Sequence, residues 1–235
     1  MSIPAMSKAS RLVAALLALV TAAPTWAGRP LQTEDAGLLG RGDCELESFA
    51  ARERVRDLPS VRVASIQLGC GVGGNTQLAL AAARARADGE HVDELTLVGK
   101  TGLRDLTDEQ AGVTLAYAAS AMRLPGGSFR HELTQVRAVV TVPHGDWLLH
   151  ANLGAERSEA ERLNTTTWAL AVERTGLGAF DLMGEVFGDD RNDPWLNAGL
   201  RWNVLTKRLM VDASYGMQLD SARAKLLTVG FKLAF

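Results

Sequence analysis

The sequence predicts an all-β protein: an antiparallel transmembrane β-barrel of about twelve strands, preceded by a cleaved N-terminal signal peptide. Three observations support this fold class. The first 27 residues have the pattern of an export signal, apolar and polar residues alternate from residue 44 onward, and the chain ends on an aromatic residue in its clearest strand.

The N-terminus has the three parts of a secretory signal. Lys8 and Arg11 supply positive charge, residues 12–21 form an apolar run, and Thr25 and Ala27 place small residues before the expected cleavage point. The run of about ten residues is much shorter than the roughly 20 that a spanning helix needs, which disfavours a retained anchor. We therefore expect residues 1–27 to be removed.

Alternation with a period of two residues is the main structural signal in the rest of the chain. In the last segment, Leu227, Val229, Phe231, Leu233 and Phe235 share one face. The same pattern extends upstream and predicts strands near 44–55, 61–70, 75–87, 93–101, 112–122, 130–142, 146–156, 164–174, 179–188, 194–205, 208–217 and 225–235. An even number of strands is expected of a single-chain bacterial barrel.

The connections between these strands alternate in length. Short turns are expected at 71–75, 143–146, 175–178 and 206–208, and longer polar loops at 88–92, 123–129, 157–163, 189–194 and 218–224. Short periplasmic turns and longer external loops are typical of outer-membrane barrels. The connections 56–60 and 102–111 depart from the pattern, since the first is short for a loop and the second long for a turn.

Residues 28–43 lack alternation and are rich in glycine and charge, so we expect a periplasmic or lumenal N-terminal segment before a barrel over 44–235. The formal net charge of −2 and the pI near 6.1 do not indicate a nucleic-acid-binding protein. A mean hydropathy of +0.02 fits a soluble protein or a barrel, because lipid-facing and lumen-facing residues average out.

If the apolar face contacts lipid, the other face lines the lumen. The predicted lumen-lining residues carry charges of both signs on neighbouring strands: Glu45, Glu47, Lys100, Arg137, Glu173, Asp181, Glu185, Arg201, Asp212 and Lys232. Such a wall can line a narrow aqueous pore or close itself with ion pairs. A barrel of about twelve strands lies between filled eight-stranded barrels and open porins, so both alternatives stay open.

The C-terminal strand contains a polar residue, a glycine and two apolar residues at fixed spacing: Thr228, Gly230, Leu233 and Phe235. This pattern resembles the assembly signal that the barrel-insertion machinery reads. It implies that this machinery and periplasmic chaperones are partners, and that lipid and lipopolysaccharide of a Gram-negative outer membrane surround the protein. The alternative is the last strand of a soluble sheet that happens to end in phenylalanine.

The two cysteines of the mature chain predict the register of the first hairpin. An exported pair of cysteines tends to be bridged. When Leu46 is placed opposite Leu68 and Glu47 opposite Gln67, Cys44 faces Cys70. Opposite residues in an antiparallel pair lie within disulfide range, so we expect a bridge between Cys44 and Cys70. Two reduced thiols packed among apolar groups are the alternative.

A competing interpretation comes from Gly69–Gly74, which fits the glycine-rich pattern of a nucleotide loop and resembles the cofactor loop of S-adenosylmethionine-dependent methyltransferases. The usual preceding acidic residue is replaced by Gln67, and the downstream pattern indicates hairpins rather than βαβ units. A periplasmic hairpin turn explains the same glycines. The methyltransferase remains the second alternative.

No catalytic residue, cofactor or metal site is predicted. His144 and His150 have no spacing that would build a metal site, and the acidic loop 189–193 lacks the spacing of a calcium loop. Lipase chemistry of the outer-membrane type would need a serine beside a histidine on the lipid-facing side, and the sequence offers no convincing pair. We therefore expect a protein that is not an enzyme.

Several short motifs carry a resemblance to a known family. Asp35-Ala36-Gly37 leads into Cys44-Glu45-Leu46-Glu47, and Gly184–Asp190 and Pro194-Trp195 follow later. These motifs resemble a family of uncharacterised proteobacterial barrels grouped with channels of phenol-degradation operons, within the wider porin-like set. The resemblance implies a passive outer-membrane channel or transporter for a small solute, with aromatic molecules among the candidates. A closed structural barrel without transport is the first alternative.

Overall fold

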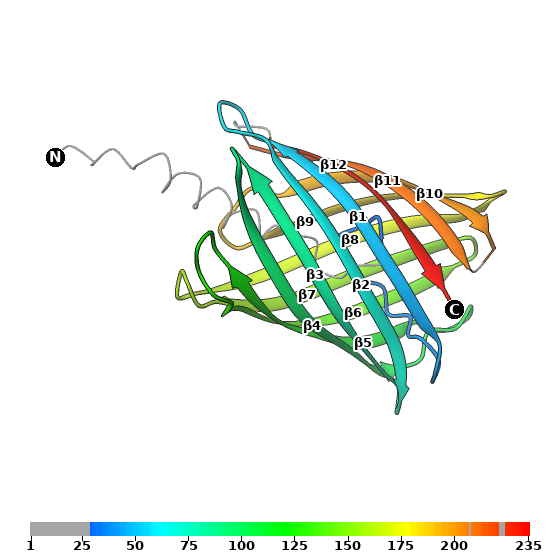
Figure 1. The fold of residues 1–235 in the computed structure, drawn as a ribbon. Coiled ribbons are helices and arrows are strands. Elements are labelled where there is room, and N and C mark those ends of the chain that lie inside the picture. Colours follow the sequence, from blue (N-terminus) through cyan, green and yellow to red (C-terminus); the bar gives the residue numbers. More distant parts are fainter. Residues whose placement is uncertain (1–28, 207, 221–223) are drawn as a thin grey trace.

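The computed structural model describes residues 29–206, 208–220 and 224–235, so the expected signal peptide lies outside the described residues. Twelve antiparallel strands form one closed barrel (Figure 1). They are β1 (Cys44–Arg54), β2 (Val61–Gly73), β3 (Thr76–Ala87), β4 (Glu90–Arg104), β5 (Gly112–Arg123), β6 (Arg130–His144), β7 (Trp147–Ser158), β8 (Leu163–Leu177), β9 (Phe180–Asp189), β10 (Trp195–Leu205), β11 (Leu209–Gln218) and β12 (Lys225–Ala234). The predicted fold class is confirmed.

Closure joins the first and the last strand. Every strand pairs with its neighbours in sequence, and β12 returns to pair with β1, with Leu46 opposite Leu233. At the seam, the backbone N–H groups of Cys44 and Phe235 donate to each other's carbonyl oxygens at 2.9 Å. A closed ladder leaves no strand edge with unpaired N–H and C=O groups, which a membrane barrel requires.

The alternation of the sequence becomes two chemically different surfaces. Leu68, Leu80 and Leu97 lie side by side on β2, β3 and β4, and their side chains point outward with exposures of 48%, 62% and 58%. Adjacent outward leucines on neighbouring strands are typical of a surface that contacts a membrane or another protein rather than water. None of the described residues belongs to a helix of the length and hydropathy that crossing a bilayer demands.

The connections define two ends of the barrel. The turn end carries Phe235 and the connections β2–β3, β4–β5, β6–β7, β8–β9 and β10–β11, and the loop end carries the other six. The expected long loop at 88–92 is wrong, because β3 and β4 are joined by a tight turn at Asp88 and Gly89 with φ of 47° and 84°. An Asp-Gly pair favours such a hairpin turn, so β4 begins earlier than its first apolar residues suggested.

The glycine-rich stretch Gly69–Gly74 is a hairpin, and the methyltransferase prediction is wrong. Strand β2 runs through Gly73, the turn has positive φ at Gly73 and Gly74 (92° and 61°), and β3 follows from Thr76. A nucleotide loop of this type has to lead into a helix whose N-terminus holds the phosphate. Here the same glycines serve the reversal of the chain.

The first hairpin has the register that the cysteines predicted. Cys44 pairs with Cys70, Leu46 with Leu68 and Glu47 with Gln67, and a disulfide joins the two cysteines over a sequence separation of 26 residues. The bridge fixes the start of β1 to the end of β2 at the turn end. The disulfide prediction is therefore confirmed by the fold.

Intact mass measurement of the non-reduced mature protein should show no free thiol. Cys70→Ser should lower the free energy of unfolding by roughly 3 kcal/mol, because the bridge closes a loop in the unfolded chain. Urea unfolding in detergent of the single variants and of the Cys44→Ser/Cys70→Ser double variant measures this change. Equal stability of wild type and double variant would contradict it.

Candidate functional site

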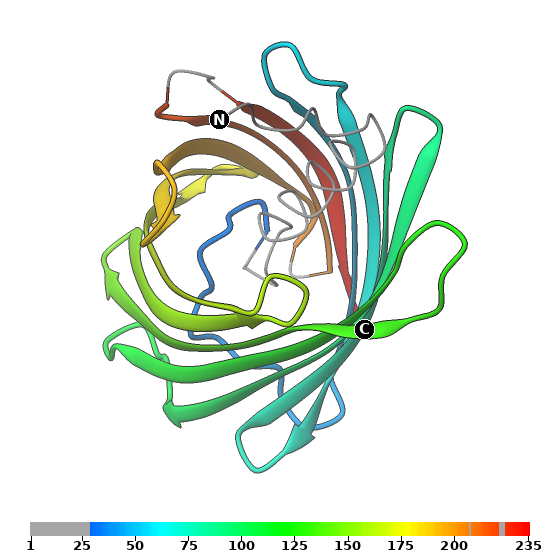
Figure 2. The ribbon, with the colours of Figure 1, turned by 90° about the vertical axis from the view of Figure 1, so that its left-hand side faces the viewer.

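The chain before β1 lies inside the barrel. We call residues 29–43 the lumenal segment. Viewed along the barrel, it crosses the interior as the blue trace before it enters β1 (Figure 2). It begins at Arg29 beside β11 and leaves at the turn end, where the Gly42 N–H donates to the Gly71 carbonyl at 2.9 Å.

A buried ion pair holds the first residue of the segment. The Arg29 guanidinium donates to both carboxylate oxygens of Asp212, at 2.6 and 3.3 Å, and lies 4.7 Å from the ring centroid of Phe49. Arg201 donates to the carbonyl oxygen of Arg29. Because removing one partner of a buried charge pair strands the other charge, this contact is a strong anchor.

A single carboxylate on β9 holds the next residues. Glu185 accepts the backbone N–H groups of Gln32 and Thr33 at 2.8 Å, and it accepts the Thr33 hydroxyl at 2.6 Å. Asn197 on β10 donates to the same carboxylate at 2.7 Å. A carboxylate that accepts several donors makes short, strong hydrogen bonds, so Glu185 fixes both the position and the direction of the segment.

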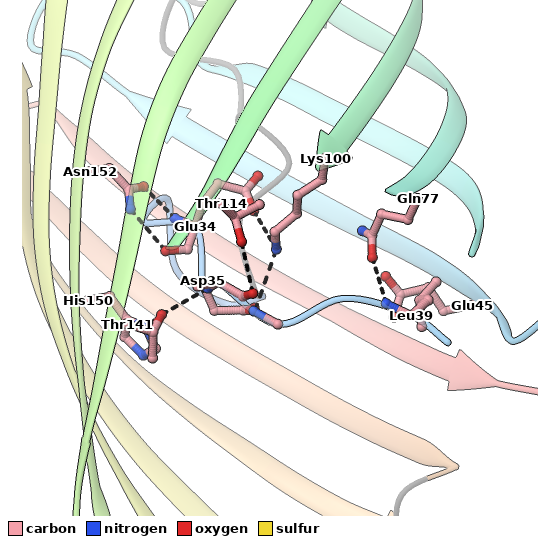
Figure 3. Close-up of polar contacts among 12 residues, drawn as sticks. Glu34, Asp35, Leu39, Glu45, Gln77, Lys100, Thr114, Thr141, His150 and Asn152 are labelled. Carbon is pink, nitrogen blue, oxygen red and sulfur yellow. Dashed lines mark hydrogen bonds and ion pairs between the residues drawn. The ribbon is translucent and has the colours of Figure 1, made fainter. Parts of the chain in front are cut away.

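In the centre of the segment, backbone N–H and C=O groups form hydrogen bonds with wall side chains. In a sheet, a neighbouring strand would supply these partners. Asn152 on β7 accepts the Glu34 N–H at 2.6 Å and donates to the Glu34 carbonyl at 3.0 Å. Thr141 accepts the Ala36 N–H at 2.8 Å, and Thr114 donates to the Ala36 carbonyl at 2.9 Å (Figure 3). Backbone groups that have no strand partner are satisfied by the barrel wall.

The wall is also shaped to receive the segment. A Cβ atom at Gly230 on β12 would collide with the Arg29 guanidinium, one at Gly199 with the Pro30 ring, and one at Gly71 with the Gly40 carbonyl. These glycines lie on three separate strands and each allows a close approach of the chain. Gly230 of the terminal-strand motif thus leaves space for Arg29.

The ten predicted lumen residues lie on the inner side of the wall. All are buried except Arg201 and Lys232, which are partly exposed to the lumen. Their charges meet one another across strands: Lys232 contacts Glu45 and Glu47 at 2.7 and 2.9 Å, and Arg201 contacts Glu173 and Asp181 at 2.6 and 3.8 Å. Asp212, Glu185, Lys100 and Arg201, all among the ten, bind the lumenal segment.

Lys100 on β4 is the cation that faces the centre of the segment. Its Nζ lies 3.4 Å from a carboxylate oxygen of Glu34 and 3.5 Å from one of Asp35 (Figure 3). The wall residues Thr114, Thr141 and Gln77 also hold the segment, but they were not predicted from the sequence. A threonine or glutamine on a polar face looks the same whether it touches water or a docked chain, so no local signal distinguishes these residues.

A small cavity remains beside the segment. It has a volume of about 40 Å³ and lies between the segment and strands β1 to β5 and β12. Its lining includes Lys100, Lys232, Glu45, Glu47 and Gln67. Such a space accommodates a few water molecules, each of which needs roughly 10–15 Å³. The lumen at this level is thus narrow, charged and able to hold water.

On the wall, a hydroxyl lies next to an imidazole, and the imidazole lies near a carboxylate. The hydroxyl is already hydrogen-bonded to the lumenal segment. Thr141 Oγ1 lies 2.9 Å from His150 Nδ1, and His150 Nε2 lies 3.9 Å from Glu173. Thr141 is fully buried and already accepts the Ala36 N–H, which leaves no approach for a substrate. Among the described residues, no group of histidine, cysteine and acidic side chains has the arrangement of a metal site.

The residues of the terminal-strand motif point in two directions. Thr228 and Gly230 face the interior, whereas Leu233 and Phe235 face outward with exposures of 36% and 66%. The outward pair continues the apolar outer surface at the turn end.

The comparisons with known proteins place the chain in a family. Residues 15–235 match the family described as "Uncharacterised conserved protein UCP029691", and the chain belongs to this family. A comparison with curated protein sequences finds no match.

Several solved structures share the architecture. The KdgM porin has a TM-score of 0.58 at 10% identity, with 80% of this chain and 99% of that chain covered. The COG4313 outer-membrane channel from Pseudomonas putida F1 has a TM-score of 0.56 at 11% identity, covering 86% and 98%. Outer-membrane phospholipase A from Escherichia coli has a TM-score of 0.52 at 10% identity, covering 89% and 93%. At these identities the likeness establishes the fold, a porin-like barrel.

The grip of the wall on the segment can be measured by hydrogen–deuterium exchange in detergent. Glu185→Ala should accelerate exchange of the Gln32 and Thr33 amides by about tenfold or more, because both amides lose a hydrogen bond to a charged acceptor. Glu94→Ala is the matched control, since Glu94 is an inward acid on β4 that bonds to Thr96 rather than to the segment. Unchanged exchange in a folded Glu185→Ala barrel would show that Glu185 does not hold the segment.

Proposed function

We propose that this protein is an outer-membrane channel of a Gram-negative bacterium that passes small polar solutes, with the lumenal segment as its constriction. The observation that carries the proposal is the polar seating of the segment. Its backbone is held by carboxylate, amide and hydroxyl groups of Glu185, Asn152, Thr141 and Thr114. Water can form hydrogen bonds with the same groups. The polar wall therefore keeps its hydrogen-bond partners when the segment moves aside.

The membrane location rests on the outer surface and on the connections. An apolar band of leucines faces outward on a closed sheet, and most short turns gather at the end that carries both Cys44 and Phe235. Short turns face the periplasm in barrels of this type. The lumenal segment thus connects to β1 at the periplasmic end of the barrel, and the loop end faces the outside of the cell.

Assembly in this membrane would use the terminal strand. Phe235 and Leu233 extend the outer apolar stripe, and both lie on the strand that closes the barrel against β1. We therefore propose that Thr228, Gly230, Leu233 and Phe235 form the signal for the insertion machinery.

Phe235→Asp should strongly reduce the heat-modifiable, membrane-inserted form of the protein, because a charge replaces the outward aromatic side chain at the end of the closing strand. Gel migration of unboiled and boiled outer-membrane fractions measures it. Phe235→Leu is the matched control and should insert nearly as well as wild type. Normal levels of the folded Phe235→Asp variant would contradict the proposal that the terminal strand is an assembly signal.

The charges of the lumen favour cations. Glu53 on β1, Glu94 on β4 and Glu156 on β7 face inward in the loop-end half of the barrel, and Glu53 is buried with no ion pair among the described residues. Carboxylates around a narrow aqueous passage attract cations and repel anions. A small polar or cationic solute therefore fits this wall better than an anion.

An aromatic solute, implied by the family resemblance, is less well supported by the wall. The inward rings of Phe187 and Trp195 stack on each other with centroids 6.2 Å apart, but Trp195 is only 8% exposed. A buried ring offers no face to a passing solute.

Planar-bilayer recording tests the channel directly. Deleting residues 29–40 should raise the single-channel conductance severalfold over wild type, because it removes the chain that fills the lumen. The outward variant Leu153→Ala is the control and should conduct as wild type does. In a salt gradient, Glu53→Gln/Glu94→Gln should reduce the preference for cations.

The rival closed barrel makes a different prediction in the same experiment. If the interior is a filled structural core, wild type and the deletion variant both remain non-conducting although the deletion variant inserts and stays heat-modifiable. That outcome would exclude transport. Equal cation preference in wild type and Glu53→Gln/Glu94→Gln would instead exclude the proposed selectivity while leaving a channel.

A further inference from the structure

The outside of the barrel carries a second charged feature, which the channel does not use. Strands β1, β2, β3 and β5 present outward arginines at the loop end, and we call them the arginine patch: Arg52, Arg54, Arg62, Arg84, Arg86 and Arg123. The outward lysine Lys225 on β12 pairs with Arg54 and continues the patch across the closing seam.

The register places like charges directly opposite one another. Arg52 pairs with Arg62, and Arg62 pairs with Arg86, so three guanidinium groups occupy one row across β1, β2 and β3. Neighbouring strands are roughly 4.8 Å apart. Like charges at directly opposite positions destabilise a sheet unless a counter-charge lies between them.

The protein supplies a counter-charge to only part of the patch. Asp93 on β4 accepts from Arg84 and from Arg123, each at 2.5 Å, and its side chain is 10% exposed between them. In the part of the chain that the structure describes, Arg62 and Arg86 contact no carboxylate, and Arg52 reaches only the Ser60 hydroxyl at 3.4 Å. The row Arg52–Arg62–Arg86 therefore lacks a negative partner.

The patch borders directly on the lipid-facing surface. Two positions further along β2 from Ala64 comes Ile66, which is 49% exposed, and Leu80 on β3 is 62% exposed. The change from arginine through alanine to leucine takes place within a few residues of each strand. In the outer-membrane location proposed above, on which this inference rests, this boundary corresponds to the level at which headgroups meet hydrocarbon.

The patch is confined to one side of the barrel. On the other side of the loop end, the outward residue Arg157 on β7 pairs with Glu159 at 2.6 Å and donates to Asn164 at 3.3 Å. Its charge is thus satisfied within the protein. A localised patch that contains the row Arg52–Arg62–Arg86 without a negative partner differs from a basic girdle that surrounds the whole barrel.

We propose that the arginine patch is a binding site for the phosphate groups of a phosphorylated glycolipid in the outer leaflet. Guanidinium groups bind phosphate through two parallel hydrogen bonds, and three of them in one row match a headgroup with more than one phosphate. The acyl chains then lie along Ile66, Leu68 and Leu80. This adjoining apolar surface favours a lipid over a free anion as the ligand.

The test uses the full-length mature barrel, delipidated in detergent, and three probes: bis-phosphorylated lipid A, its fully dephosphorylated form, and inorganic pyrophosphate. Native mass spectrometry measures the bound lipid, and thermal unfolding measures its effect on Tm. Arg62→Gln/Arg86→Gln removes two guanidinium groups of the row. Arg157→Gln is the matched control on the opposite side.

Wild type and Arg157→Gln should retain bis-phosphorylated lipid A and gain thermal stability, and Arg62→Gln/Arg86→Gln should bind it at least about tenfold more weakly. Equal binding by the double variant, or equal binding of the dephosphorylated lipid, would overturn the proposal. Pyrophosphate binding as tight as that of lipid A would overturn the lipid assignment in favour of a free-anion site. If the double variant does not fold, Arg62→Gln and Arg86→Gln as single variants carry the same comparison.

Discussion

The closed hydrogen-bond ladder between β1 and β12 is the constraint on which the rest of the structure depends. Hydrocarbon offers no partner to backbone N–H and C=O groups, so a sheet in a membrane must pair every strand on both sides. Cys44 and Phe235 exchange two backbone hydrogen bonds at this seam. Closure then separates an inside from an outside, and each residue of a strand belongs to one of them.

The interior created in this way has its own requirement. Buried charges and amides on the wall need partners, since an unsatisfied polar group costs much of its lost hydration. Ion pairs such as Lys232 with Glu45 satisfy part of the wall, and the lumenal segment satisfies Asp212, Glu185 and Asn152. These polar wall groups bind the segment, and they could equally form hydrogen bonds with water in its place.

The exterior follows a simpler rule with one exception. Outward residues are apolar where lipid chains would lie, as at Leu80 and Leu97. The barrel fold itself is shared with the KdgM porin at 10% identity. The arginine patch breaks the apolar surface on one side only. Arg84 and Arg123 are neutralised by Asp93. The row of guanidinium groups without a carboxylate instead indicates a negative partner from outside the chain.

The sequence by itself determined the strands, their two faces and the register of the first hairpin, because these depend on local alternation and on matching pairs such as Cys44 with Cys70. It misplaced the start of β4, where an Asp-Gly turn was hidden among polar residues. Only the tertiary structure decided that residues 29–43 lie inside the barrel against Glu185 and Thr141. Those contacts join residues more than 100 positions apart, and a chain without alternation carries no local record of the wall that receives it.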